Sequence, residues 1–443
     1  MTLLSLLVLV GCATNEAPKG IILVSLDTLR ADRLGAYGST RGLTPNLDRF
    51  AAEGVVFDQG YAQSNETLYS HASLFTGQYP SRLGVLDGGF RLPAKATTLA
   101  GAFRGASWQT AAFVAGGHLA APFGLGGGFD VYNDASSFGS IRETADLALR
   151  WLDETASQEA PFFLFVHGYD THDRYLKPTP FGYAAADPAE QGVGATVART
   201  VGAASNIVDG YASDRIDLIE ILSQARPRFE RGRGIAEVDP EARKLAAEDV
   251  QHLAATYDGA VAWADACFGL FMAGLRERGL LDEVLIVVVS DHGEELGEQG
   301  VFNHRTSMSD ATAHVPLLVR LPGGANGGRR VTGLVELIDV APTLLDLAGV
   351  GSLDSPGQSL RGALEGGTWT GRSSAITEGA LRMLSVRGPA ARLSVEGLRL
   401  ENPFLPAMIA VAPIDGVTVT LTGDVGEGPA LREALVRHMA GGG

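Results

Sequence analysis

Residues 20–26, with the sequence GIILVSL, are followed at once by Asp27 and decide the fold of this chain. The run is apolar and shows no polar alternation, which predicts a strand buried on both faces inside a parallel sheet. Similar runs and the helical patterns between them lie at 110–115, 162–167, 284–290 and 315–320, and at 99–104, 140–155 and 241–278. This alternation predicts an α/β fold with a mostly parallel central sheet flanked by helices.

Two further helices have clear end signals. The segment TPNLDRFAAEG begins with Thr44 as its N-cap and ends at Gly54, and IDVAPTLLDLAG lies between Asp339 and Gly349. A strand, VVFDQGYAQ, follows the first of them, and another short helix is expected from about Ser70. These signals extend the alternating pattern over most of the chain.

The chain divides into three predicted parts. Residues 1–19 are expected to be a lipoprotein signal and tether, residues 20–365 the large α/β domain, and residues 366–443 a small C-terminal α+β subdomain. The last part contains the short runs SSAITEG, RMLSVRG, ARLSVEG and VTVTLTG and ends in PALREALVRHM, which predicts a small antiparallel sheet plus one helix. Residues 176–240 are rich in Ala, Gly and Pro, so we expect a surface insertion there.

The N-terminal stretch MTLLSLLVLVGC places Cys12 directly after an apolar run and Gly11. The run of about ten residues is too short to span a bilayer, so we interpret it as the apolar part of an export signal. Lipid attachment at Cys12 would make the protein an exported bacterial lipoprotein, periplasmic or at the cell surface. No Lys or Arg precedes the run, and the alternative is a buried N-terminal strand. Cys267 is then left without a disulfide partner and is expected in the core.

The charge balance limits the kind of partner. The chain has 35 basic and 51 acidic residues, a formal net charge of −16. Such an acidic protein is a poor partner for nucleic acid. An anionic substrate would need a local positive centre, which a bound metal ion supplies most simply.

Polar side chains gather where the predicted strands end. Asp27 follows the first strand, Asp291 and His292 follow VLIVVVS, and His167 and His172 end or follow FFLFV. Ligands of open α/β sheets bind at the carboxyl ends of the strands. Two carboxylates and a histidine from separate strands suit a divalent metal ion, although each residue alone fits a cap or a turn equally well.

Seven motifs, taken in order, resemble those of sulfatases in the alkaline-phosphatase superfamily. They are SLDTLRADRLGAYG, LTPNLDRFAAEGVVFDQGYAQ, SHASLFTGQYPSRLG, FFLFVHGYDTHDRY, SDHGEELGEQG, HVPLLVRLPG and IDVAPTLLDLAGV. The similarity runs from about residue 21 to residue 360 and implies an alkaline-phosphatase-like fold, with residues 20–365 as the catalytic domain.

The resemblance implies one divalent metal ion held by Asp27, Asp291 and His292, with the nucleophile beside it. Ca²⁺ is the first choice, and Mn²⁺, Mg²⁺ and Zn²⁺ are alternatives. The family's nucleophile opens a Cys/Ser-x-Pro-Ser-Arg motif, which corresponds to residues 67–71 here, so Thr67 is the expected nucleophile and a fourth metal ligand. A helix N-terminus at Thr67 would favour the transferred anion, whereas a simple helix cap is the alternative role.

Several positions depart from the family pattern. Threonine cannot be converted to formylglycine, so the aldehyde-hydrate mechanism of sulfatases is not available to Thr67. Thr28 stands where the family often has a second aspartate, and Gly116 and His304 stand where it has lysines. His71 replaces the motif's arginine, and a histidine supplies less certain positive charge at neutral pH.

The resulting assignments cover nucleophile, metal, substrate and lipid. Catalytic roles are expected for Thr67, His172, His304 and His71; metal binding for Asp27, Asp291, His292 and Thr67; substrate binding for His118, His167, Arg30 and Arg305; and lipid attachment for Cys12. Arg30 could equally form a structural ion pair.

The expected activity is metal-dependent hydrolysis of sulfate or phosphate esters by in-line attack of Thr67. One alternative is a phosphotransferase or phosphodiesterase on the same scaffold. Another is a catalytically impaired homologue that binds a metal ion or a glycan. The expected substrate is a small anionic ester or a sulfated or phosphorylated glycan or lipid, with membrane contact only through the lipid anchor.

Overall fold

A computed structural model of the chain describes residues 18–84, 91–155, 160–172, 247–297, 302–305, 307–379, 383–396 and 418–439. Cys12 with its apolar run, and the insertion expected at 176–240, lie outside the described residues. The boundaries between the three expected parts remain predictions.

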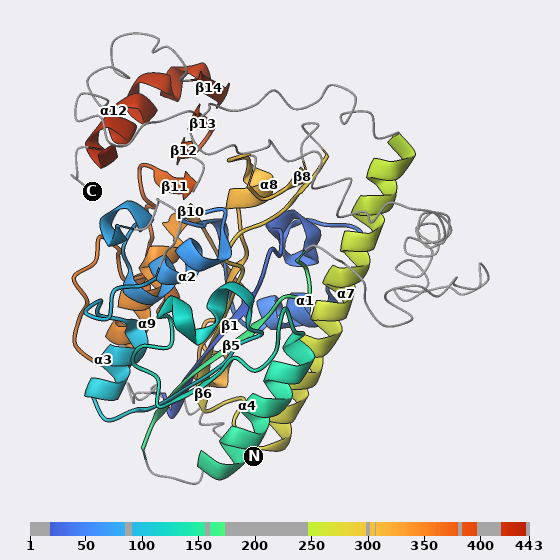
Figure 1. Ribbon diagram of the computed structural model, residues 1–443, viewed down its shortest axis with the longest axis vertical. Helices are drawn as coiled ribbons and strands as arrows, with labels where there is room; N and C mark the ends of the chain where they lie inside the picture. The colour runs from blue at the N-terminus through green and yellow to red at the C-terminus, as the bar shows by residue number, and fades with distance from the viewer. Residues whose placement is uncertain are drawn as a thin grey trace, which may run out of the picture.

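An eight-stranded sheet forms the centre of the protein (Figure 1). Its order is β10-β2-β9-β6-β1-β5-β3-β4, and β9 alone runs antiparallel to its two neighbours. The strands are β1 Gly20–Leu26, β2 Val55–Tyr61, β3 Gln109–Phe113, β4 Val131–Asn133, β5 Phe162–Gly168, β6 Val284–Val289, β9 Leu317–Arg320 and β10 Arg329–Glu336. The predicted mostly parallel α/β sheet is confirmed; β4 and β10 were not expected from the sequence.

Helices cover both faces of this sheet, as Figure 1 shows. One face packs against α1 (Pro45–Ala52), α4 (Ile141–Thr155) and α7 (Ala247–Glu277), and the other against α2 (Thr67–Thr76), α3 (Leu99–Gly105) and α9 (Val340–Ala348). Shorter elements are η1 Ala31–Arg33, η2 Gly35–Tyr37, η3 Pro80–Leu83, η4 Gly117–Leu119, η5 Ala121–Phe123, β7 Glu295–Leu296, β8 Phe302–Asn303, α8 Asp310–Ala313, η6 Pro322–Gly324, η7 Leu337–Asp339 and α10 Arg361–Leu364.

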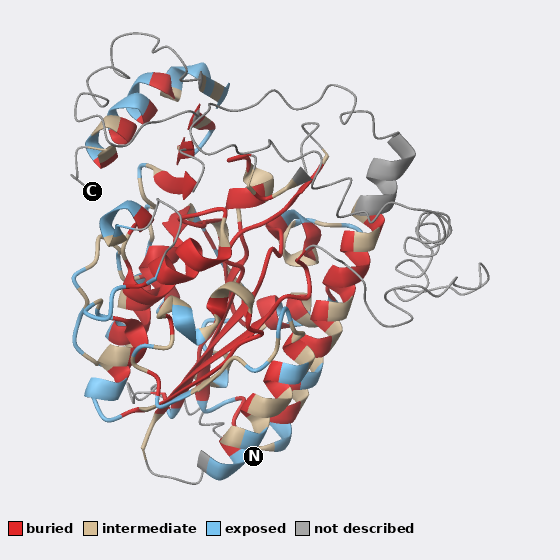
Figure 2. Cartoon of the chain, in the orientation of Figure 1, coloured by how far each residue is buried: buried red, intermediate tan, exposed pale blue. Residues whose placement is uncertain are grey.

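Strand β1 lies between β6 and β5 and is buried along its whole length (Figure 2). Ile21 and Leu23 face the core under α2, whereas Ile22 and Val24 face the core under α7. Burying such a side chain contributes about 1.5–3 kcal/mol to stability, so an apolar run without alternation is the sequence that a strand covered on both faces requires.

By length and composition, helix α7 between Ala254 and Glu277 could cross a membrane. In the folded protein, however, 72% of the most apolar stretch of this helix is buried. It therefore packs as a core helix along α4 and α1, and its Cys267 is buried in the core as expected.

A second, four-stranded sheet follows the large one in the chain. Its antiparallel strands are β11 Ala375–Gly379, β12 Met383–Arg387, β13 Ala391–Glu396 and β14 Thr418–Gly423, and they precede η8 (Val425–Glu427) and the last helix, α12 (Gly428–Met439). Leu431 and Leu435 of α12 share a small core with Tyr79 and Ile338 of the preceding part. The predicted antiparallel sheet with one helix is confirmed.

Candidate metal and ester-transfer site

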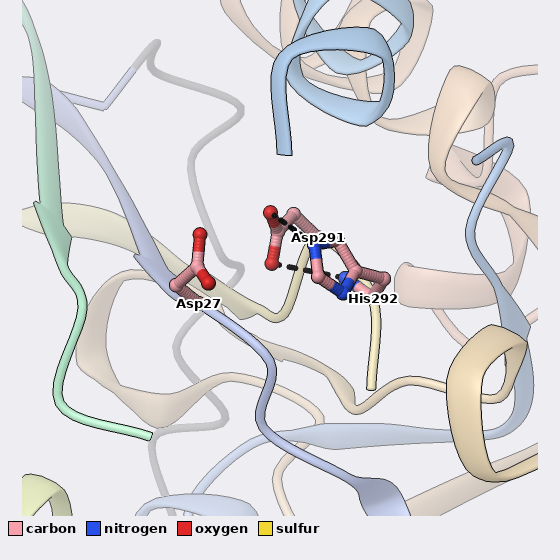
Figure 3. Close-up of side chains that lie close together, drawn as sticks. All are labelled: Asp27, Asp291 and His292. Atoms are coloured by element: carbon pink, nitrogen blue, oxygen red, sulfur yellow. Dashed lines mark hydrogen bonds and ion pairs between the residues drawn. The ribbon is translucent and has the colours of Figure 1, made fainter. Parts of the chain in front are cut away.

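The ends of β1 and β6 bring three expected metal ligands together. Asp27 follows β1, and Asp291 and His292 follow β6, which is hydrogen-bonded to β1 along its length. One ligand atom from each of the three lies within 4.8 Å of the others, and all three residues are buried. Figure 3 shows Asp27 facing the pair formed by Asp291 and His292.

The oxygens of the two carboxylates are used unequally. Asp291 Oδ1 accepts hydrogen bonds from the backbone N–H groups of Thr28, at 3.1 Å, and His292, at 2.9 Å. Among the described residues, no hydrogen bond reaches the buried Asp27 Oδ1 or Asp291 Oδ2. Buried charged oxygens without donors are costly unless a cation compensates them, so the donor set fits a divalent metal ion.

The two carboxyl groups also shift each other's ionisation. Burial raises the pKa of Asp27 well above its usual range, and the nearby Asp291 raises that pKa further. Burial alone would raise the pKa of Asp291 as well, but His292 and His71 hold it below its usual value. Both shifts come from burying two carboxyl groups side by side, and a cation bound between them would favour the ionised form of Asp27.

His292 presents a nitrogen lone pair to the site. Its Nδ1 lies 3.0 Å from the carbonyl oxygen of Gly293, so Nδ1 carries the proton and Nε2 is unprotonated. Burial is the main cause that lowers the pKa of His292 to about 4, which keeps the ring neutral. A neutral imidazole with a free Nε2 is the form that binds metal ions.

Thr67 is the first residue of α2, one turn earlier than the expected start near Ser70. Its Oγ1 lies 3.3 Å from His292 Nε2, and its side chain lines a pocket. Ser70 holds the helix in this position because its hydroxyl donates to the Asp291 carbonyl oxygen at 2.6 Å. The structure thus brings Thr67 to the expected metal ligands, at the helix end where backbone N–H groups favour an anion.

The pocket beside Thr67 has a volume of about 170 Å³. Its walls are Glu66, Thr67, Leu68, Tyr69, His118, Phe123 and Arg305. Two of the four expected substrate-binding residues, His118 and Arg305, therefore lie beside the expected nucleophile. Arg305 is 3.5 Å from Glu66 and 40% exposed in its side chain, so its guanidinium remains accessible to an anionic ligand.

His172 and His304 lie together on the side of the site formed by β5 and the chain after β6. Their ring centres are 5.2 Å apart, and the ring of His304 is 4.4 Å from that of His292. His304 Nδ1 lies 3.2 Å from Glu294, a carboxylate that can orient the imidazole. The expected general acids are thus placed next to the metal ligands.

His71 and His167 are fully buried beneath the site rather than in the pocket. Both ring nitrogens of His71 are engaged, Nδ1 with the Thr67 carbonyl oxygen at 2.7 Å and Nε2 with Ser25 at 2.9 Å. His167 Nε2 lies 3.4 Å from Asp27 Oδ2. The two side chains lie behind the nucleophile helix and beside the Asp27 carboxylate, and neither lines the pocket beside Thr67. The catalytic role of His71 and substrate binding by His167 stay predictions.

Arg30, which was expected to bind the substrate, does not line the pocket beside Thr67. Its guanidinium donates to both carboxylate oxygens of Asp32, at 2.9 and 2.7 Å, and to the carbonyl oxygen of Glu294 at 3.0 Å. These bonds fasten the loop after β1 to the loop after β6. These contacts match the structural ion pair given above as the alternative role of Arg30, and its assignment to substrate binding stays a prediction.

Several residues that were given no catalytic, metal or substrate role from the sequence also shape the site. Tyr257 of α7 donates to the Thr28 carbonyl oxygen and accepts from the Arg30 N–H, which fixes the loop that carries Asp27. Phe123 lines the pocket, and Phe138 packs against His118 and His172. Thr28 belongs to the loop that carries Asp27, and its backbone is left-handed with φ of 56°. Its place inside a family motif, directly after Asp27, is the one sequence signal that could have pointed to this loop.

Proteins of similar sequence include several sulfatases. The family model described as Sulfatase matches residues 19–350. N-acetylglucosamine-6-O-sulfatase of Bacteroides thetaiotaomicron is 25% identical over 419 residues, covering 82% of this chain and 74% of that protein. Arylsulfatase K of Bos taurus is 36% identical over 107 residues, which cover 24% of this chain and only 19% of that relative's length.

Solved structures of similar fold agree with the sequence match. Phosphonate monoester hydrolase of Agrobacterium radiobacter aligns with a TM-score of 0.67 at 21% identity, over 96% of this chain and 95% of that one. A protein in complex with its substrate D-glucosamine-2-N,6-O-disulfate aligns with a TM-score of 0.67 at 19% identity, over 96% and 97% of the two chains. With the family match spanning most of its length, the chain belongs to the sulfatase family.

Proposed function

We propose that this protein is a metal-dependent hydrolase of sulfate or phosphate esters in which Thr67 is the nucleophile. The position of Thr67 carries the proposal: its hydroxyl lies 3.3 Å from His292 Nε2 and lines the pocket that Arg305 also lines. A divalent cation at Asp27, Asp291 and His292 would polarise the ester's non-bridging oxygens and lower the pKa of the Thr67 hydroxyl.

The chain's own residues would carry the reaction in two displacements. Thr67 Oγ1 loses its proton to water and attacks the sulfur or phosphorus atom, while the bond to the alcohol oxygen breaks. His172 or His304 donates the proton that the leaving oxygen takes up. Water then gives a proton to the same histidine and attacks the sulfur or phosphorus atom, while the bond to Thr67 Oγ1 breaks. The threonine oxygen takes up a proton from solvent, and the inorganic anion is released.

A second function, phosphoryl transfer or phosphodiester hydrolysis, is favoured by the threonine itself. Formylglycine forms only from cysteine or serine, so the covalent intermediate here would be an ordinary threonine ester. A phosphothreonine can be hydrolysed with help from a metal ion and a general base, whereas a threonine sulfate must be attacked at sulfur. The fold similarity to a phosphonate monoester hydrolase is consistent with both functions.

The finer assignments belong to the same proposal. Ca²⁺ is our first choice of metal because two carboxylates dominate the donor set, and the His292 nitrogen keeps Mn²⁺ and Zn²⁺ open. A sulfated or phosphorylated glycan or lipid is the proposed substrate, in line with the sulfated glucosamine bound by one protein of similar fold. Export as a lipoprotein through Cys12 is likewise proposed, and labelling of cells with a fatty acid tests it.

Hydrolysis of p-nitrophenyl sulfate, p-nitrophenyl phosphate and a p-nitrophenyl phosphodiester, with Ca²⁺, Mn²⁺ or Zn²⁺, tests the proposal. We expect Thr67→Ala to lower kcat by about 10³-fold or more, because the nucleophile is lost. Thr76→Ala is the matched control, since it removes a threonine from the other end of α2, where the hydroxyl bonds only its own helix and the following turn.

The ester that is cleaved decides between the two functions. Phosphoester turnover that depends on Thr67 would favour phosphoryl transfer, and sulfate turnover that depends on Thr67 would show that threonine serves a sulfatase. No turnover of any ester by the metal-loaded protein would contradict the proposal and favour an impaired homologue that binds a metal ion or a glycan.

A further inference from the structure

Phe138 combines two unfavourable features. Its side chain is 52% exposed although it is apolar, and its backbone is left-handed with φ of 54°. A bulky residue in this conformation is strained, and such strain persists mainly at functional sites. The described part of the chain has five non-glycine residues with positive φ. Two others of them, Thr28 and Asn303, are neighbours in sequence of the site residues Asp27 and His304.

The ring of Phe138 extends the wall of the pocket outward. Its centre lies 6.2 Å from that of His118 and 5.7 Å from that of His172. His118 in turn lies 6.2 Å from Phe123, and both residues line the pocket beside Thr67. Phe123, His118 and Phe138 thus form a row of rings in edge-to-face contact, which we call the aromatic platform, from the pocket wall to the exposed Phe138.

Neither feature of Phe138 is explained by packing in the core. Tyr169 supports one side of the ring, with centres 4.9 Å apart, and is itself buried, while about half of the phenylalanine side chain remains open to solvent. Exposed aromatic surface supported from behind and continuous with a ligand pocket is suited to stacking against a ligand.

We propose that Phe138 is a specificity-determining residue whose ring stacks against an uncharged ring with a broad apolar face in the organic part of the ester. This inference rests on the proposed function, because the anionic group must lie at Thr67 for the organic part to reach the aromatic platform. Aryl groups and pyranose sugars share the required chemistry, since each offers a broad apolar face. A flexible alkyl chain offers no such face and would gain little from Phe138.

Three esters of the anion that the wild-type protein hydrolyses test the inference: a p-nitrophenyl ester, a methyl glucoside 6-ester and an n-hexyl ester. We expect Phe138→Ala to lower kcat/KM for at least one ring ester, relative to the hexyl ester, by about five- to tenfold. The loss should appear in KM, because stacking binds ground state and transition state alike. Alanine keeps a Cβ in the left-handed conformation, so backbone strain is retained while the ring is removed.

Two further variants separate stacking from a general loss of apolar surface. Phe138→Trp should restore the preference for the ring ester. Leu270→Ala removes an equally exposed apolar side chain, 53% exposed, on helix α7 and should leave the preference unchanged. The ring ester whose kcat/KM falls most in Phe138→Ala identifies the ring that stacks on Phe138 as an aryl group or a sugar.

Each result decides the inference. An unchanged preference in Phe138→Ala, or an equal loss for all three esters, would overturn it, since the residue would then be neutral or purely structural. If the wild-type protein hydrolyses no ester, the proposed function fails, and calorimetric titration of the three esters into wild-type and Phe138→Ala protein decides the stacking separately. Weaker binding of a ring ester alone would support stacking; equal binding would overturn it.

Discussion

Asp27 and Asp291 show what a metal site requires of single residues. The Asp27 carboxyl is buried, lies close to a second carboxylate and to His292, and one of its oxygens has no hydrogen-bond donor among the described residues. In the metal-free protein, ionising both buried carboxyl groups is electrostatically unfavourable, and a bound cation would compensate their charge.

The first prediction concerns the effect of ionising Asp27 on the stability of the metal-free protein. The folded-state pKa of Asp27 is raised by burial, so the folded protein binds a proton more tightly there than the unfolded chain does. Above the unfolded pKa, ionising Asp27 is therefore destabilising, and the metal-free protein should lose stability as pH rises toward and through the raised folded pKa. Asp27→Asn should flatten this pH dependence and raise the melting temperature of the metal-free protein at neutral pH by a few degrees.

Melting of chelator-treated protein between pH 5 and pH 8 measures this effect. Asp354→Asn, at an exposed carboxylate, serves as the control and should change neither the melting temperature nor its pH dependence. Added metal ion should stabilise the wild-type protein but not Asp27→Asn. A destabilised metal-free Asp27→Asn variant would show that the carboxylate, not the cation, supports the fold.

At the scale of elements, the end of β10, the start of α9 and the segment before β11 are joined by one buried network. Arg372 Nη1 lies 3.1 Å from Glu336 Oε2, and Arg372 also pairs with Asp339. Glu336 accepts from the Tyr79 hydroxyl at 2.8 Å and from the Ile376 N–H at 2.7 Å. A single guanidinium therefore compensates two buried carboxylates where the small sheet meets the large one.

The second prediction removes that guanidinium. Arg372→Met should destabilise the protein by about 3–5 kcal/mol, because it leaves two buried carboxylates without their cation. Urea denaturation of the metal-loaded protein measures the change. Arg361→Met is the matched control: its ion pairs with Asp346 and Glu365 are partly exposed, so at most about 1 kcal/mol should be lost. Equal losses in both variants would contradict this account of the network.

At the scale of the whole molecule, the net charge of −16 opposes the approach of an anionic ester. Long-range repulsion is screened by salt, with a Debye length of about 10 Å at 0.1 M. We therefore expect kcat/KM for a simple anionic ester to rise roughly twofold between low and physiological ionic strength. A sulfate monoester or phosphodiester that also carries a quaternary ammonium group has no net charge and should show no rise. A fall with salt would mean that Arg305 and the cation dominate the approach of the substrate.

Much of the architecture was predictable because it follows from chain order and periodicity. The apolar runs at 20–26 and 284–289 became neighbouring strands β1 and β6, and parallel pairing necessarily brought Asp27 and Asp291 to the same edge. β10 was not expected, because its sequence RRVTGLVE is interrupted by polar residues and Gly333, and the strand is only half buried at its start.

The amino-acid sequence by itself determined the α/β layering, the strand ends that carry Asp27, Asp291 and His292, and membership of the sulfatase family, since these depend on local pattern and motif order. Tertiary structure alone decided which polar side chains reach the pocket. Arg30 is bound to the carbonyl oxygen of Glu294, and His71 and His167 are buried behind the site, whereas Arg305 and His118 line the pocket. The reason is that a side chain's partner is set by neighbours distant in sequence, which no local pattern records.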